Sequence, residues 1–131
     1  VRWFLKDESH PGADAVLHRL IEHPEFFAVP EFFCFEVYAV LCRVHPSGPK
    51  VFIEGMIPIL NSGIFRQPMT EKLATQAIHY MEKGLTGYDA CYAALAREMK
   101  GIWLTFDNKA HQCLAKEKIS HLLTKGLPKN W

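Results

Sequence analysis

The sequence predicts an α/β protein, a three-layer sandwich with helices on both faces of a parallel sheet. Short apolar stretches alternate along the chain with longer stretches of helical periodicity. The short stretches are apolar throughout, as strands covered on both faces are. A chain of 131 residues suits one hydrophobic core. We therefore expect a single domain over residues 1–131.

The N-terminal half is expected to alternate helical and extended stretches, bounded by Pro, Gly and Asn breakers. In order, they are a helix over 11–22, a strand over 26–29, a helix over 30–44, a helical stretch over 51–60 and a strand over 64–66. Pro30 suits the first turn of its helix, since that turn needs no backbone N–H. Gly55 and Pro58 make a helix less favourable over 51–60.

The C-terminal half is expected to begin with two helices that each start at a threonine cap. Thr70 caps a helix that reaches residue 83, and Thr86 caps one that reaches about residue 100. After a tight turn at Gly101 we expect a strand over 102–105, a helix over 108–116 and a last strand over 119–123.

Composition narrows the class of protein. The formal net charge of +1 excludes a polybasic binder held mainly by charge, although a local basic groove remains open. No apolar run reaches 18 residues, and no signal-peptide pattern is present. The cysteines lack CxxC spacing, so we expect reduced core thiols of a cytoplasmic protein; they are Cys34, Cys42, Cys91 and Cys113.

Three carboxylates indicate a divalent-metal site. Asp107 follows a strand, where ligands of parallel sheets bind, and Asp89 opens the preceding helix. Glu36 lies in a helix that is apolar on nearly every side, where an unpaired carboxylate would be costly. If the three converge, Mg²⁺ or Mn²⁺ would relieve their repulsion and activate a water for attack on a phosphodiester.

Each acid also has a structural explanation. Glu36 fits a solvent channel or an ion pair with Arg43. Thr86 and Asp89 have the spacing of a capping box, and Asp107 suits the N-cap of the next helix. Spacing alone does not decide between caps and ligands, and one carboxylate can be both.

Several neighbouring residues are candidates for support or for RNA contact. Thr105 could hydrogen-bond an acid or a metal-bound water, or it could simply pack in the strand. Asn108 could support the site or simply begin the next helix. RNA contacts would fall to cations around the acids, although surface cations are usually just solvated. The cations are Arg66, Lys72, Lys109, Lys116 and Lys118.

The stretch LTGYDACYAALAREMKGIWLTFD, residues 85–107, resembles the C-terminal half of a PIN domain of the bacterial toxin (VapC-like) type. Its Tyr-Asp-Ala helix start, at Asp89, and its Thr-x-Asp strand end, at Asp107, carry the likeness. Residues 29–43, VPEFFCFEVYAVLCR, resemble the family's Pro-Glu…Glu-Val helix, which places Glu36 at an acidic position of the family. Residues 1–5 resemble the segment after the family's first strand.

The resemblance implies a Mg²⁺- or Mn²⁺-dependent ribonuclease, with Glu36, Asp89 and Asp107 as catalytic and metal-binding residues. It also implies a toxin that forms a homodimer and binds an antitoxin protein. The family's first strand and its Asp would precede Val1, and we expect the natural protein to contain them. Asp7, Glu8 and Asp14 lie too late in the sequence to replace that Asp.

Two alternatives stay open at this point. The first is a catalytically inactive PIN-like module that binds RNA or a protein partner. The second is an unrelated doubly wound protein, such as a phosphoacceptor domain, which would need an acid after a strand near residues 48–60. A cluster of aromatic residues is expected to pack in the core, and the alternative is a groove for a dimer mate or an antitoxin helix. The cluster consists of Phe26, Phe27, Phe32, Phe33, Phe35 and Tyr38.

Overall fold

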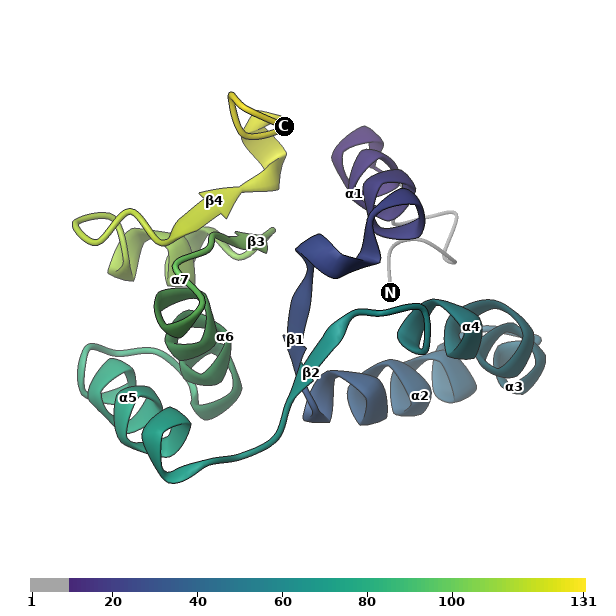
Figure 1. Cartoon of the computed structure of the whole chain (residues 1–131), viewed down its shortest axis with the longest axis horizontal. Helices are drawn as coiled ribbons and strands as arrows, with labels where there is room; N and C mark the ends of the chain where they lie inside the picture. The colour runs from purple at the N-terminus through teal and green to yellow at the C-terminus, as the bar shows by residue number, and fades with distance from the viewer. Residues whose placement is uncertain (1–9) are drawn as a thin grey trace. The chain divides into compact units, whose positions relative to one another are not determined.

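The computed structural model describes residues 10–131, which divide into two compact units, up to Gln67 and from Pro68 onward (Figure 1). Each unit combines helices with one pair of parallel strands. The predicted α/β class is therefore confirmed, and the single domain stays a prediction. The expectations for residues 1–5, Asp7 and Glu8 lie outside the described residues.

The first unit follows the predicted alternation with shifted boundaries. Its elements are α1 (Pro11–Glu22), the 3-10 turn η2 (Pro24–Phe26), β1 (Ala28–Pro30), α2 (Phe32–Val44), α3 (Gly48–Val51), the π-helix η3 (Phe52–Met56), α4 (Ile57–Leu60) and β2 (Phe65–Gln67). Pro30 was expected in a helix but ends β1, opposite Gln67 in the parallel register. Residues 48–49, expected in a loop, begin α3.

The stretch over 51–60 is helical despite Gly55 and Pro58. Pro58 has no N–H to give to a carbonyl of the preceding turn. The chain passes through the wider π-helical turn of η3 just before this residue.

The core of the first unit lies between α2 and the helices that follow it. Leu41 and Met56 are fully buried there, beside Cys34, Val37 and Leu60. A side chain at Gly48 would place its Cβ 2.1 Å from the carbonyl oxygen of Leu41. Only glycine lets α3 approach α2 this closely.

The opposite face of α2 is exposed, which corrects the expectation that Glu36 is enclosed by apolar side chains. Glu36 is exposed, and so are its neighbours Phe35 (66%) and Tyr38 (53%). The aromatic cluster is thus not a single core group. Cys34, Val37 and Leu41 form the buried stripe, and the aromatic residues between them face outward.

The second unit matches the predicted order of elements throughout. Its elements are α5 (Glu71–Glu82), α6 (Gly87–Glu98), β3 (Trp103–Thr105), α7 (Asn108–Cys113), β4 (Ser120–Leu122) and the 3-10 turn η4 (Leu123–Lys125). The Thr70 and Thr86 hydroxyls accept from the amides of Leu73 and Asp89, so both predicted caps are confirmed. β3 pairs in parallel with β4.

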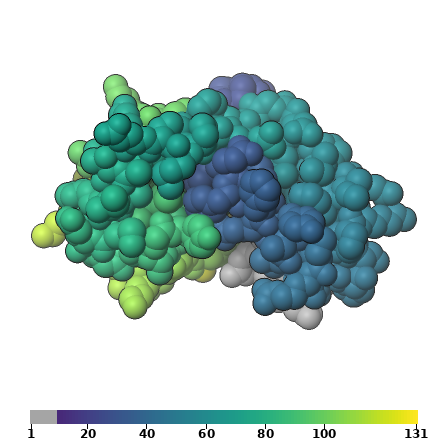
Figure 2. All heavy atoms as spheres, turned by 90° about the horizontal axis from the view of Figure 1, so that it is seen from below, coloured from purple at the N-terminus to yellow at the C-terminus, as the bar shows by residue number. Residues whose placement is uncertain are grey.

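Helices α5 and α6 pack side by side and supply most of this unit's core (Figures 1 and 2). Alpha-helix α6 buries four alanines, and their small side chains allow α5 to come close. From α5, Leu73, Ala77 and Tyr80 are buried, Tyr80 completely.

The four cysteines are free thiols, as expected. Cys34 and Cys91 are buried, but Cys113 is exposed, so the core position expected for Cys113 is wrong. No helix within residues 10–131 is long and apolar enough to cross a membrane.

Candidate functional site

Asp89 and Asp107 come together in the second unit, near enough for a hydrogen bond between their side chains. The lengths of α6 and β3 explain this. From Asp89 to Glu98 the helix rises about 14 Å, and from Trp103 to Asp107 an extended chain covers about 13 Å. The turn between them sends β3 back along α6, so the end of the strand returns to the start of the helix.

A threonine hydroxyl holds the backbone amide of each aspartate. Thr86 Oγ1 accepts from the Asp89 amide at 3.3 Å, and Thr105 Oγ1 accepts from the Asp107 amide at 3.0 Å. Asp107 Oδ1 in turn accepts from the Ala110 amide at 3.0 Å and caps α7. The cap expected at Asp107 is confirmed, and so is the Thr86 half of the capping box expected at Asp89.

The surroundings of the pair shift the pKa of Asp89. Burial raises the pKa of Asp89, and the charge of Asp107 and a hydrogen bond with Asp107 raise it further. A hydrogen bond with the Thr86 side chain opposes these effects without cancelling them. Asp89 is half-buried while Asp107 is exposed, so the pair opens to solvent on the Asp107 side.

The residues expected to support the pair lie beside it. Thr105 is buried and bonds the backbone of Asp107. Asn108 and Lys109 are exposed in the first turn of α7, immediately after Asp107.

Glu36 and Arg66 belong to the first unit. Arg66 is exposed on β2, where its Nε lies 3.7 Å from Glu31 Oε2. The convergence of Glu36 with Asp89 and Asp107 stays a prediction.

Glu117, which no sequence motif indicates, joins the segment after α7 to the part of the chain that contains α5 and α6. Its carboxylate accepts hydrogen bonds from Tyr80, Lys83 and Arg97. These partners are 20 to 37 residues away in the sequence, so no local motif reveals them.

The donor chemistry of the pair fits a hard divalent cation. Two carboxylates that repel each other offer oxygen ligands, and Mg²⁺ commonly binds through one or two carboxylates and several waters. Among residues 10–131, no group of three or more His, Cys, Asp or Glu side chains gathers as a metal site. The two aspartates by themselves fall short of such a group.

Comparison with known protein families identifies the family of this chain. A family model described as PIN domain matches residues 1–115, which include both aspartates. The chain belongs to the PIN domain family. Neither a curated protein nor a solved structure matches it.

PIN domains are generally metal-dependent nucleases, and they bind RNA. Membership confirms the family that the resemblance indicated and gives this PIN domain a nuclease function in general terms.

Proposed function

We propose that this PIN domain is a Mg²⁺- or Mn²⁺-dependent endoribonuclease that hydrolyses RNA phosphodiester bonds. The observation that supports the proposal is the closeness of the Asp89 and Asp107 carboxyl groups; burial raises the pKa of Asp89, and the charge of Asp107 raises it further. Two carboxylates held together against repulsion in a nuclease family are best explained as ligands of a cation. Glu36 is proposed as a third ligand.

The chain's own residues fix the geometry of this site. Thr86 and Thr105 hold the two acids through their amides, so each carboxylate projects from an anchored backbone position. Asn108 is exposed beside Asp107 and is proposed to hydrogen-bond the waters of the site. A bound cation would supply an activated water and stabilise charge that develops on the phosphate.

RNA is proposed to lie across the acids with its phosphates against exposed cations. Lys109 is exposed two residues after Asp107 and is the first candidate. Arg66 is the second, since its side chain is exposed beside Glu31. Contacts of this kind position the backbone of a nucleic acid and do not select its sequence.

The resemblance to VapC-like proteins extends the proposal to a cytoplasmic toxin with an antitoxin partner and a homodimeric state. Exposed apolar side chains in the first unit support a protein partner, because large apolar side chains gathered on a surface favour association. Phe35 and Tyr38 on α2 are of this kind, and so is Ile53 (65% exposed) on η3.

The test is cleavage of structured RNAs by the full-length protein with Mg²⁺ or Mn²⁺, and with a chelator. We expect metal-dependent cleavage that falls at least about 100-fold in Asp89→Asn and Asp107→Asn, because each loses a charged ligand. Glu71→Gln is the matched control, since Glu71 also lies in the first turn of a helix. Cleavage by Asp89→Asn at the wild-type rate would refute the proposal. RNA binding without cleavage would favour the inactive module.

A further inference from the structure

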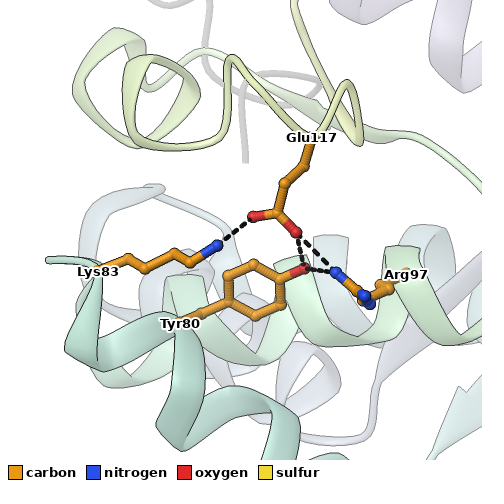
Figure 3. A network of polar contacts seen from close by, with 4 residues as sticks. All are labelled: Tyr80, Lys83, Arg97 and Glu117. Atoms are coloured by element: carbon orange, nitrogen blue, oxygen red, sulfur yellow. Dashed lines mark hydrogen bonds and ion pairs between the residues drawn. The ribbon is translucent and has the colours of Figure 1, made fainter.

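Glu117 is the centre of a polar network that joins three segments of the second unit (Figure 3). Its Oε1 accepts from the Tyr80 hydroxyl at 2.7 Å and from Arg97 at 2.8 Å, and its Oε2 accepts from Lys83 at 3.0 Å. Arg97 also donates to the Tyr80 hydroxyl at 3.4 Å. Both carboxylate oxygens are therefore engaged, and the donors come from α5, from the residue that follows α5, and from α6.

The network is more than a pair of surface charges. Tyr80 is fully buried, and the Glu117 side chain is only 18% exposed. Partial burial raises the pKa of Glu117, but the hydrogen bonds from Tyr80 and Lys83 and the charges of Lys83 and Arg97 outweigh it, so the net pKa is lowered. Glu117 therefore stays ionised at neutral pH, and its bonds are charge-assisted.

The segment that carries Glu117 needs such support. Lys118 adopts a left-handed backbone (φ 57°), which is unfavourable for a residue with a Cβ. The amides of Glu117 and Lys118 both point to the carbonyl of Leu114, directly after α7. The tight turn that ends α7 is thus held to α5 and α6 by the Glu117 side chain.

Helix α7 links this turn to the aspartate pair. Asp107 caps the start of α7 through the Ala110 amide, and Glu117 fastens the segment after its end. Six residues of helix span about 9 Å, so a tilt at one end of α7 moves the other. A second tie, between His111 Nδ1 and Ser120 Oγ at 2.7 Å, fixes α7 to β4 but not to α6, which carries Asp89.

We infer that Glu117 is a positioning residue for the aspartate pair: by holding the turn after α7 against α5 and α6, it sets the place of Asp107 opposite Asp89. The importance of that placement for metal binding rests on the proposed function. The placement itself does not, because it concerns only contacts within the folded chain.

The test compares Glu117→Ala with wild type in two measurements. In the first, without metal, hydrogen exchange follows the Ala110 amide, which donates to Asp107, against the amide of Ala94 in the middle of α6. We expect exchange at Ala110 to rise at least about 10-fold relative to Ala94. In the second, Mn²⁺ affinity is expected to fall about 10-fold, as for other residues that orient ligands.

Thr70→Ala is the control for lost stability, because it removes a helix cap from α5 without touching α7. It should change neither the Ala110-to-Ala94 ratio nor the Mn²⁺ affinity. If Glu117→Ala fails to fold, Lys83→Met, which removes one ion pair of the network, should show a smaller change in the same direction.

An unchanged ratio in Glu117→Ala, or an equal change in Thr70→Ala, would overturn the inference. Failure of the wild-type protein to bind Mn²⁺ would instead overturn the proposed function. In that case a raised exchange ratio would still establish that Glu117 positions Asp107.

Discussion

At the scale of single residues, Asp89 and Asp107 each serve the fold and the candidate site together. Asp89 lies in the first turn of α6, where the helix dipole favours a negative charge, and Asp107 caps α7. Those roles alone would suit acids far apart on the surface. Burial and the nearby Asp107 both raise the pKa of Asp89, and the two carboxylates repel each other when both are ionised; a pair perturbed in this way marks a candidate functional site.

The raised pKa of Asp89 predicts how stability depends on pH. Burial and Asp107 raise this pKa above the ordinary 3.8, so the folded state binds the proton more tightly than the unfolded state. The contribution of Asp89 to stability should therefore decrease as the pH rises from about 4 through the raised pKa. Asp89→Asn should lack this loss. Urea unfolding of both proteins, in chelator, between about pH 4 and about pH 7 measures it. Parallel curves would contradict the prediction.

The cap at Thr86 gives a second prediction at this scale. Thr86→Ala should destabilise the protein by about 1 kcal/mol, because the Asp89 amide loses its acceptor. Thr70→Ala should cost a similar amount through the equivalent bond in α5. Mn²⁺ titration then separates the two variants, since only Thr86→Ala loosens a proposed ligand. Equal Mn²⁺ affinities in the two variants would show that the Thr86 cap has no part in the site.

At the scale of elements, the turn between α6 and β3 reverses the chain, so that β3 runs back toward the start of α6. The sequence indicates Gly101 as the turn residue, but the left-handed residue is Lys100 (φ 54°). The Gly101 amide bonds the Ala96 carbonyl at 2.8 Å and the Lys100 amide bonds Arg97, as in a Schellman motif. Glycine is the usual residue at the position that Lys100 occupies.

Lys100→Gly should therefore raise stability by about 0.5–1 kcal/mol, since glycine removes the strain of the left-handed backbone at a smaller entropic cost. Lys109→Gly is the control, because Lys109 lies in helix α7, where glycine should cost up to about 1 kcal/mol. Thermal or urea unfolding measures both. A Lys100→Gly protein less stable than wild type would show that the lysine side chain stabilises the turn.

Local chemistry accounts for what could be predicted in the second unit. The caps at Thr70 and Thr86, the order of elements over 71–122 and the roles of Asp89 and Asp107 all depend on residues close in sequence. Glu117 could not be found this way, because its partners are distant. The exposure of Glu36 was also missed, because apolar neighbours on a helix do not show which of them face outward.

At the scale of the whole molecule, the described residues form two units, each with one parallel strand pair and its own helices. The PIN domain match extends across both. Within residues 10–131, the candidate ligands that lie close together are the two aspartates of the second unit. The account therefore depends most on whether these two carboxylates bind a divalent cation.

The most direct measurement is a Mn²⁺ titration by calorimetry on the full-length protein, beside Asp89→Asn, Asp107→Asn and the control Glu71→Gln. We expect binding by wild type and by Glu71→Gln, and affinity at least about 100-fold weaker in both aspartate variants. Wild-type protein that does not bind Mn²⁺, or an Asp89→Asn variant that binds as wild type does, would contradict this expectation.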